Sequence, residues 1–192
     1  MTADLLNRPS EFASDATTRE YDVVVVGGGI VGLTLACGLR STDLRVAVIE
    51  SQSVQQAASR ARAYAFSPVS ARILDGLGLW NEVGPQLTHF QRVKLSDSDY
   101  QKALTFRPED GRGDAVYYSA EHTVLMRSLQ SAVQSSPNID YWCKSSVLEQ
   151  TAPNQLVIDA QGKQLTFKTQ LVVGADGARS GVRDRAKIKT FG

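Results

Sequence analysis

The sequence has few cysteines, almost no net charge and no long apolar run. Its 192 residues include only two cysteines, Cys37 and Cys143, which are too few for a disulfide framework. We therefore expect both to be small, buried or half-buried residues of a protein in a reducing, cytoplasmic compartment. The formal net charge of +1 gives no electrostatic case for binding nucleic acid. No stretch reaches the roughly 18 apolar residues that a membrane-spanning helix needs.

Side-chain clusters that bind metals or perform catalysis are also missing from the sequence. His, Cys and carboxylate residues do not occur at metal-site spacing, and no acid–base pair or nucleophile stands out. The first 20 residues contain acids, Ser and Thr without an apolar core, so they do not form a secretory signal. We expect a flexible leader over residues 1–19 and one globular domain over residues 20–192.

The most informative stretch is Tyr21–Gly32, with the sequence YDVVVVGGGIVG. The four consecutive β-branched residues Val23–Val26 predict a parallel strand that is buried on both faces. Gly27, Gly29 and Gly32 follow at the spacing G-x-G-x-x-G. In such a motif the first glycine permits a tight turn, the second lets the backbone approach a pyrophosphate, and the third lets a helix pack closely on the strand.

A helix over residues 30–39 and an acidic strand end follow this motif. The free N–H groups at the start of the helix, at Ile30 and Val31, are expected to point at phosphate groups. The strand Arg45–Glu50 then places Glu50 18 residues after the last glycine of the motif. A carboxylate at this distance accepts both hydroxyls of an adenosine ribose. It would disfavour a 2′-phosphate, which leaves FAD or NAD as the nucleotide. The alternative is a glycine turn and a surface glutamate in an unrelated α/β domain.

The rest of the chain predicts a mixed α/β domain. Helices are expected over residues 67–77, with Ser67 as N-cap and Pro68 at the first helical position, and over 122–135. A loop is expected over residues 51–59. Further strands are expected over 90–96, 102–106, 115–118, 139–143, 146–151, 155–159, 164–167 and 171–173. This order predicts a Rossmann-like fold with a parallel central sheet, a βαβ start, a small antiparallel excursion and a β-meander.

A second signature lies in Leu171–Arg183. A buried strand there breaks at Gly174, and Asp176-Gly177 precedes a helix start at Ser180. The carboxylate of Asp176 would lie where the strand opens toward the ligand crevice of the sheet, and it could accept ribityl or ribose hydroxyls. The alternative is an Asp-Gly turn before a surface helix.

Three parts of the chain together resemble the FAD-dependent aromatic hydroxylases, the single-component flavoprotein monooxygenases that include p-hydroxybenzoate hydroxylase. These parts are Gly27–Gly32 with Glu50, Arg62–Ser67 leading to Leu77–Trp80, and Gly174–Arg183. The middle part is most similar to the ubiquinone-biosynthesis branch of the family. The resemblance covers about Tyr21–Arg183 and implies that the domain binds FAD.

The resemblance also implies further FAD contacts. Arg62 would contact the phosphate and ribose region, where a fork-shaped guanidinium can donate two hydrogen bonds; otherwise it is a surface cation. His122, which is not taken as a catalytic base, and Arg127 would lie along the ribityl chain, or else are ordinary helix-surface residues. Val147 would pack near the adenine through its backbone, and Asp176 would serve FAD.

The activity implied by the resemblance is hydroxylation of an aromatic ring with O₂ and reduced pyridine nucleotide, NADH or NADPH. The branch implies a small aromatic substrate, a prenylated phenol that is a quinone precursor. Such a substrate would bring the enzyme to a membrane surface or into a quinone-biosynthesis complex.

Family members are usually longer, and the Gly-Asp-Ala motif and second sheet that complete their active site are not found after Arg183. We therefore expect the N-terminal portion of a longer hydroxylase, without hydroxylase activity by itself. Two alternatives stay open. One is a related flavin oxidoreductase that does not hydroxylate, such as a prenyl reductase or halogenase. The other is a non-catalytic FAD-binding fragment.

Overall fold

The computed structural model describes residues 17–99, 102–111 and 113–190. The chain divides into two compact units: Met1–Ala58 with Leu129–Gly192 form unit 1, and Ser59–Ser128 form unit 2. Residues 1–16 of the predicted leader lie outside the described residues. The first strand begins at Thr18, so the last two residues of the predicted leader belong to it.

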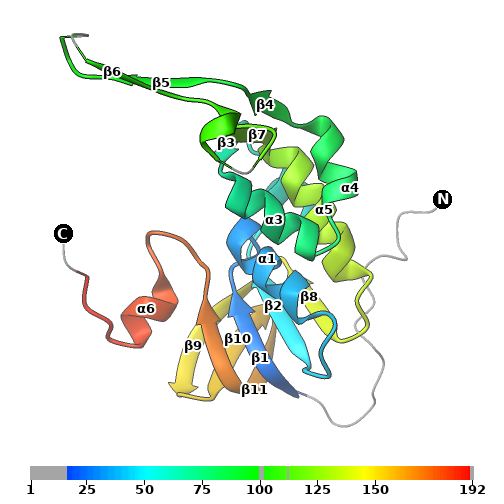
Figure 1. Cartoon of the computed structure of the whole chain (residues 1–192). Coiled ribbons are helices and arrows are strands. Elements are labelled where there is room, and N and C mark those ends of the chain that lie inside the picture. Colours follow the sequence, from blue (N-terminus) through cyan, green and yellow to red (C-terminus); the bar gives the residue numbers. More distant parts are fainter. Residues whose placement is uncertain (1–16, 100–101, 112, 191–192) are drawn as a thin grey trace. The chain divides into compact units, whose positions relative to one another are not determined.

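Unit 1 is built on a six-stranded sheet with the strand order β8-β2-β1-β11-β10-β9, and Figure 1 shows β1 between β2 and β11. The strands are β1 (Thr18–Val26), β2 (Val46–Glu50), β8 (Ile139–Cys143), β9 (Ser145–Ala152), β10 (Gln155–Ala160) and β11 (Lys163–Gly174). Neighbours among β8, β2, β1 and β11 pair in parallel, whereas β10 pairs antiparallel with both β11 and β9. The α/β fold class predicted from the sequence is confirmed.

Apolar residues at alternate positions join the parallel strands of unit 1 to its antiparallel strands. Because side chains alternate between the two faces of a strand, residues two apart share one face. One core cluster contains Val24, Val26, Ala47, Ile49, Leu156, Ile158, Leu165 and Phe167. β2 is buried along its whole length, as expected for a parallel strand covered on both faces.

β11 is one strand where the sequence predicted two, over 164–167 and 171–173. Its polar middle residues continue the strand because β1 supplies partners for them. The Thr169 hydroxyl donates to the carbonyl oxygen of Asp22, and the Gln170 side chain donates to the Asp22 carboxylate over 2.8 Å. The strand therefore continues through the polar residues, where the sequence predicted a break.

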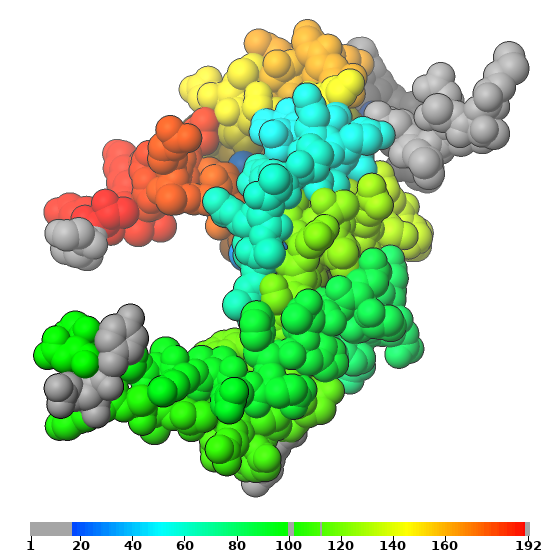
Figure 2. Space-filling view, turned by 90° about the horizontal axis from the view of Figure 1, so that it is seen from above, coloured from blue at the N-terminus to red at the C-terminus, as the bar shows by residue number. Residues whose placement is uncertain are grey.

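The helices of unit 1 are α1 (Ile30–Leu39), α2 (Val54–Ala58) and α6 (Gly181–Arg185). α1 has the predicted bounds. α2 lies inside the predicted loop 51–59, where the Ser53 hydroxyl caps the amide of Gln56 and Ala57 is buried. Figure 2 shows α6 and the residues after it (orange to red) at one side of unit 1. Both cysteines are buried and free, as predicted.

Unit 2 contains a three-stranded antiparallel sheet and a separate hairpin. The sheet has the order β3-β7-β4, and the hairpin consists of β5 and β6 (Figure 1). The strands are β3 (Ala63–Phe66), β4 (Thr88–Phe90), β5 (Val93–Ser96), β6 (Ala103–Phe106) and β7 (Tyr117–Glu121). The α-helices are α3 (Pro68–Gly76), α4 (Trp80–Val83) and α5 (His122–Gln134), the last of which continues into unit 1, and short 3₁₀ helices cover Gly84–Gln86 and Pro108–Asp110.

The N-terminal cap of α3 is as predicted from the sequence, whereas two nearby segments differ from the prediction. Ser67 is the N-cap of α3, where its side chain accepts from the Ser70 amide, and Pro68 is the first helical residue. α4 begins at Trp80, shortly after the helix predicted over residues 67–77, where no second helix was predicted. The strand predicted over residues 90–96 is two strands, β4 and β5, in different sheets. None of the described helices combines the length and apolar character that crossing a bilayer requires.

Candidate nucleotide-binding site

The structure places three of the predicted site residues at the carboxyl ends of neighbouring parallel strands. Glu50 ends β2, Gly27 follows β1, and Asp176 follows β11. Backbone hydrogen bonds continue past the strand ends: the Gly27 amide donates to Ile49 over 2.8 Å, and the Ala175 amide donates to Val26 over 2.7 Å. The carboxyl edge of a parallel sheet is where open α/β folds bind their ligands.

Two glycines of the motif are required by the fold, and one leaves open space. Gly27 has φ +110, and a Cβ there would lie 2.3 Å from the carbonyl oxygen of Ala175. A Cβ at Gly32 would lie 1.9 Å from the carbonyl oxygen of Gly27, so only glycine lets α1 start this close to the turn. A Cβ at Gly29 would meet no atom within 4 Å. Gly29 therefore keeps open a space that a methyl group would fill.

The N-terminus of α1 lies beside this space and is free to receive an anion. Gly29 is its N-cap, no side chain caps the helix, and no acidic residue lies in its first turn. The first amides of a helix have no partner inside the helix, and the helix dipole makes this end positive. Val31 in the first turn is 74% exposed. The predicted phosphate-binding position of Ile30 and Val31 thus has the right local chemistry.

The Glu50 carboxylate is buried and already oriented. It is only 8% exposed. One of its oxygens accepts from the Gly28 amide over 2.9 Å, and the other accepts from the Gln52 amide over 2.8 Å and the Ser51 hydroxyl over 3.2 Å. A carboxylate has about four acceptor positions, so roughly one is left for a ribose hydroxyl. The contact of Glu50 with the hydroxyls of an adenosine ribose stays a prediction.

Gly28 and Tyr141 are parts of this site that the motif did not indicate. Gly28 occupies an unspecified position of G-x-G-x-x-G, yet a Cβ there would lie 2.8 Å from the Cβ of Glu50 and 2.9 Å from the hydroxyl of Tyr141. The Tyr141 hydroxyl is buried and has no hydrogen-bond partner among the described residues. Burial raises the pKa of Tyr141, which keeps its hydroxyl neutral. The only sign of this in the sequence was that Gly28 completes a run of three consecutive glycines, residues 27–29.

Asp176 organises the turn that follows β11. One carboxylate oxygen accepts from the Ser180 hydroxyl, and the other accepts from the Val182 amide over 3.2 Å. Burial alone would raise the pKa of Asp176, but the hydrogen bonds from Ser180 and from backbone amides outweigh it and hold the pKa below its usual value. The carboxylate therefore caps the start of α6, which is the structural alternative that the sequence left open. Its role toward FAD stays a prediction.

Because the folded-state pKa of Asp176 is lowered, its ionised form stabilises the fold. This contribution is fully present above the unfolded pKa of about 3.9 and is lost as the pH falls through the lower folded value. We expect Asp176→Asn to lower the free energy of unfolding at about pH 6 and the difference from wild type to shrink as the pH falls below about 4. Urea unfolding at several pH values measures this. A difference that does not change with pH would contradict the role of the ionised carboxylate.

Unit 2 carries the other predicted contacts, apart from Val147. Arg62 is exposed and immediately precedes β3, and Arg127 is exposed on α5. His122 is only 2% exposed, so it is not a helix-surface residue. Its Nδ1 atom lies 3.1 Å from the hydroxyl of Tyr64.

Val147 lies on β9 of unit 1. Its side chain packs against the core cluster of the sheet, and its carbonyl oxygen accepts from the Arg185 guanidinium over 3.1 Å. The backbone of Val147 is thus engaged by α6 through its carbonyl oxygen. The contact with adenine predicted from the sequence stays a prediction.

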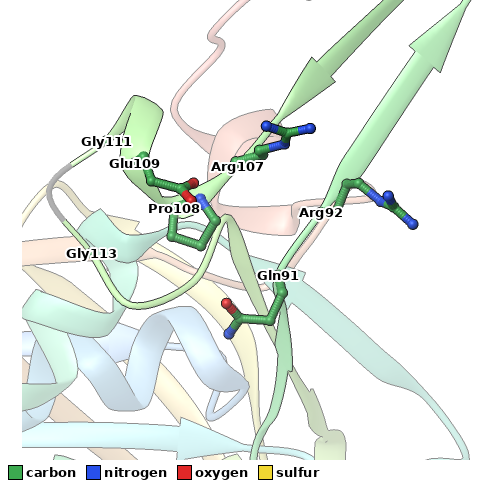
Figure 3. A pocket seen from close by; sticks show the side chains of 7 residues that line it. All are labelled: Gln91, Arg92, Arg107, Pro108, Glu109, Gly111 and Gly113. Atoms are coloured by element: carbon green, nitrogen blue, oxygen red, sulfur yellow. The ribbon is translucent and has the colours of Figure 1, made fainter.

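A separate hollow of about 700 Å³ lies within unit 2. Arg92 and Arg107 flank the β5–β6 hairpin there and extend toward the same side in Figure 3, whereas Gln91 points away from them. None of the site residues predicted from the sequence lines this hollow. In the part of the chain that the structure describes, no three His, Cys, Asp or Glu side chains are placed to hold a metal ion.

The glycine turn, the oriented acid and the open helix end agree with the comparison to known families. A family model described as "FAD binding domain" matches residues 20–192. The chain belongs to this family. Among relatives of the FAD-binding domain, an uncharacterized Synechocystis protein is 39% identical over 94% of the chain, and the 3-demethoxyubiquinol 3-hydroxylase of Escherichia coli is 30% identical over 90%. The human ubiquinone biosynthesis monooxygenase COQ6 is 28% identical over 91%.

Solved structures confirm the fold of the FAD-binding domain. p-Nitrophenol 4-monooxygenase from Pseudomonas putida matches with a TM-score of 0.76 at 24% identity, over 91% of this chain and 45% of that chain. The flavin-dependent monooxygenase PieE, in complex with FAD and substrate, matches with a TM-score of 0.75 at 19% identity, over 94% and 34%. The chain spans 41% to 45% of the length of the three relatives named above.

Proposed function

We propose that this FAD-binding domain holds FAD for a monooxygenase that hydroxylates an aromatic ring of a quinone precursor. The observation that carries the proposal is the open space at Gly29 beside the uncapped N-terminus of α1. A pyrophosphate needs both a backbone that it can approach closely and amides directed at it. The residues present therefore fit the phosphate part of the cofactor.

Different residues of unit 1 would bind different parts of FAD. The amides of Ile30 and Val31 would donate to the pyrophosphate, and Glu50 would accept from the adenosine ribose. Hydrogen bonds from Gly28 and Gln52 orient the Glu50 carboxylate before any nucleotide binds. The Glu50 side chain therefore loses little conformational entropy when FAD binds. FAD, when bound, supplies the redox chemistry, and the protein supplies binding and orientation.

The proposed reaction, with O₂ and with NADH or NADPH as reductant, is supported by the activities for which two relatives are named. The Escherichia coli relative is a 3-demethoxyubiquinol 3-hydroxylase and the human relative a ubiquinone biosynthesis monooxygenase, so the proposed substrate is a prenylated phenol. Such a substrate would place the working enzyme at a membrane surface or in a complex of quinone biosynthesis. Because the chain spans less than half of these relatives, we propose that it binds FAD but does not hydroxylate by itself.

FAD binding is the first test of the proposal. Titrating the purified chain into FAD should quench the flavin fluorescence to saturation, whereas NADP, with its 2′-phosphate, should compete poorly because Glu50 is negatively charged. With a prenylated phenol, NADPH and O₂ added, we expect no hydroxylated product from the chain alone. Tight binding of NAD without binding of FAD would contradict the proposed cofactor. Product formation would contradict the proposed inactivity and leave the cofactor assignment standing.

A further inference from the structure

His122 contacts the backbone and a side chain of the same short segment of unit 2. It is the first residue of α5, and its amide donates to the carbonyl oxygen of Arg62 over 2.7 Å. Its ring lies beside the ring of Tyr64, with centroids 5.8 Å apart and Nδ1 at 3.1 Å from the hydroxyl. A single buried residue thus bonds on both sides of Ala63, the first residue of β3.

The backbone around Arg62 is fixed, and its guanidinium is presented to solvent. The Arg62 amide donates to the carbonyl oxygen of Arg60 over 2.9 Å, and Ala63 pairs with Glu121 in the β3–β7 ladder. Arg62 itself is exposed, and its only hydrogen bonds to described residues are those of its backbone. A held backbone with an unpaired guanidinium suits a side chain that awaits an anionic ligand.

We infer that Tyr64 and His122 are positioning residues for Arg62. They fix the chain at the start of β3, so that the Arg62 guanidinium loses less conformational freedom when it binds a phosphate oxygen of the flavin nucleotide. The inference rests on the proposed function, in which Arg62 contacts FAD. It also gives His122 an indirect role in place of the direct flavin contact predicted from the sequence, because the imidazole is buried and already paired with Tyr64.

A double-mutant cycle tests the inference. We expect Tyr64→Phe to weaken FAD binding about three- to tenfold, the scale of one hydrogen bond, in the chain that keeps Arg62. In the Arg62→Ala background the same change should alter the affinity less than about twofold, because residues that act through one another are not additive. His122→Asn keeps the backbone amide that donates to Arg62 but shortens the side chain that reaches Tyr64. It should therefore weaken FAD binding as Tyr64→Phe does. Flavin-fluorescence quenching measures the four affinities of the cycle and that of His122→Asn.

The salt dependence of binding separates positioning from general packing. A guanidinium–phosphate contact weakens as salt screens it, so wild-type affinity should fall with added salt and the affinity of Arg62→Ala should fall less. Tyr64→Phe should show the shallower dependence as well. Tyr117→Phe, which removes a hydroxyl from a tyrosine that is 41% exposed on β7, is the matched control and should leave affinity and salt dependence unchanged.

The outcomes distinguish this inference from the proposed function. If wild type does not bind FAD, the proposed function is wrong. If wild type binds FAD but Tyr64→Phe and His122→Asn both bind as wild type does, the positioning role is wrong. Equal losses with and without Arg62 would also overturn it, because the pair would then act on the cofactor or on the fold independently of Arg62.

Discussion

Gly29→Ala is expected to weaken FAD binding strongly while leaving the fold intact. The new methyl group meets no protein atom within 4 Å, and the backbone at φ −78 and ψ −178 accepts alanine. The methyl would instead take the space through which a pyrophosphate approaches, and forcing an extra methyl into a packed contact costs about 1–3 kcal/mol, or roughly 5- to 150-fold in affinity. The free energy of unfolding should stay within about 1 kcal/mol, because a small loss at the helix cap offsets a gain from the stiffer unfolded chain.

Two other glycines provide the controls for this prediction. Gly32→Ala places a Cβ 1.9 Å from a backbone oxygen that cannot move away, so it should destabilise the fold by about 3 kcal/mol or more. Gly76→Ala at the end of α3 meets nothing within 4 Å, so it should leave FAD binding unchanged and raise the free energy of unfolding by at most about 1 kcal/mol. Chemical unfolding and FAD titration of the three variants measure both quantities. A Gly29→Ala variant that binds FAD as wild type does would exclude the pyrophosphate from this turn.

Features that depend on residues adjacent in the chain could be predicted from the sequence, whereas features that depend on tertiary packing could not. The bounds of α1, the N-cap Ser67 and the acid at the end of β2 were predictable because each depends on residues adjacent in the chain. The short helices α2 and α4 were not. A helix of four or five residues is not stable by propensity alone and depends on tertiary packing, as the burial of Ala57 and Val83 indicates.

The candidate site divides in the same way. Gly27, Gly29, Gly32 and Glu50 follow from a local pattern with a known spacing. The need for glycine at position 28 arises from contacts with Glu50 and with Tyr141, a residue of β8 that pairing with β2 brings alongside. Strand pairing between distant segments cannot be read from one sequence, so neither Tyr141 nor the hydrogen bond from the Gly28 amide to Glu50 could be predicted. These contacts, which hold the glycine turn and Glu50 in place, are known only from the structure.

Glu50→Arg is the second change with a large expected effect, a loss of about 2–5 kcal/mol in FAD binding, which is the scale for removing one partner of a buried charged contact. The substitution removes the acceptor of the Gly28 and Gln52 amides, and a buried amide without a partner costs about 1–3 kcal/mol. We therefore expect the apo protein to lose stability too. The affinity must be compared at a temperature where unfolding measurements show the variant to be folded.

Glu50→Gln separates the role of the charge from the role of the shape. Its amide oxygen can still accept one backbone N–H, so the variant should fold, but the negative charge that disfavours a 2′-phosphate is gone. Calorimetry with ADP and with adenosine 2′,5′-bisphosphate should show weaker ADP binding and a smaller preference for ADP over the bisphosphate. If ADP binds as tightly as before and the preference is unchanged, Glu50 supports only the glycine turn. The ribose would then lie elsewhere, even though Glu50→Arg destabilises the protein.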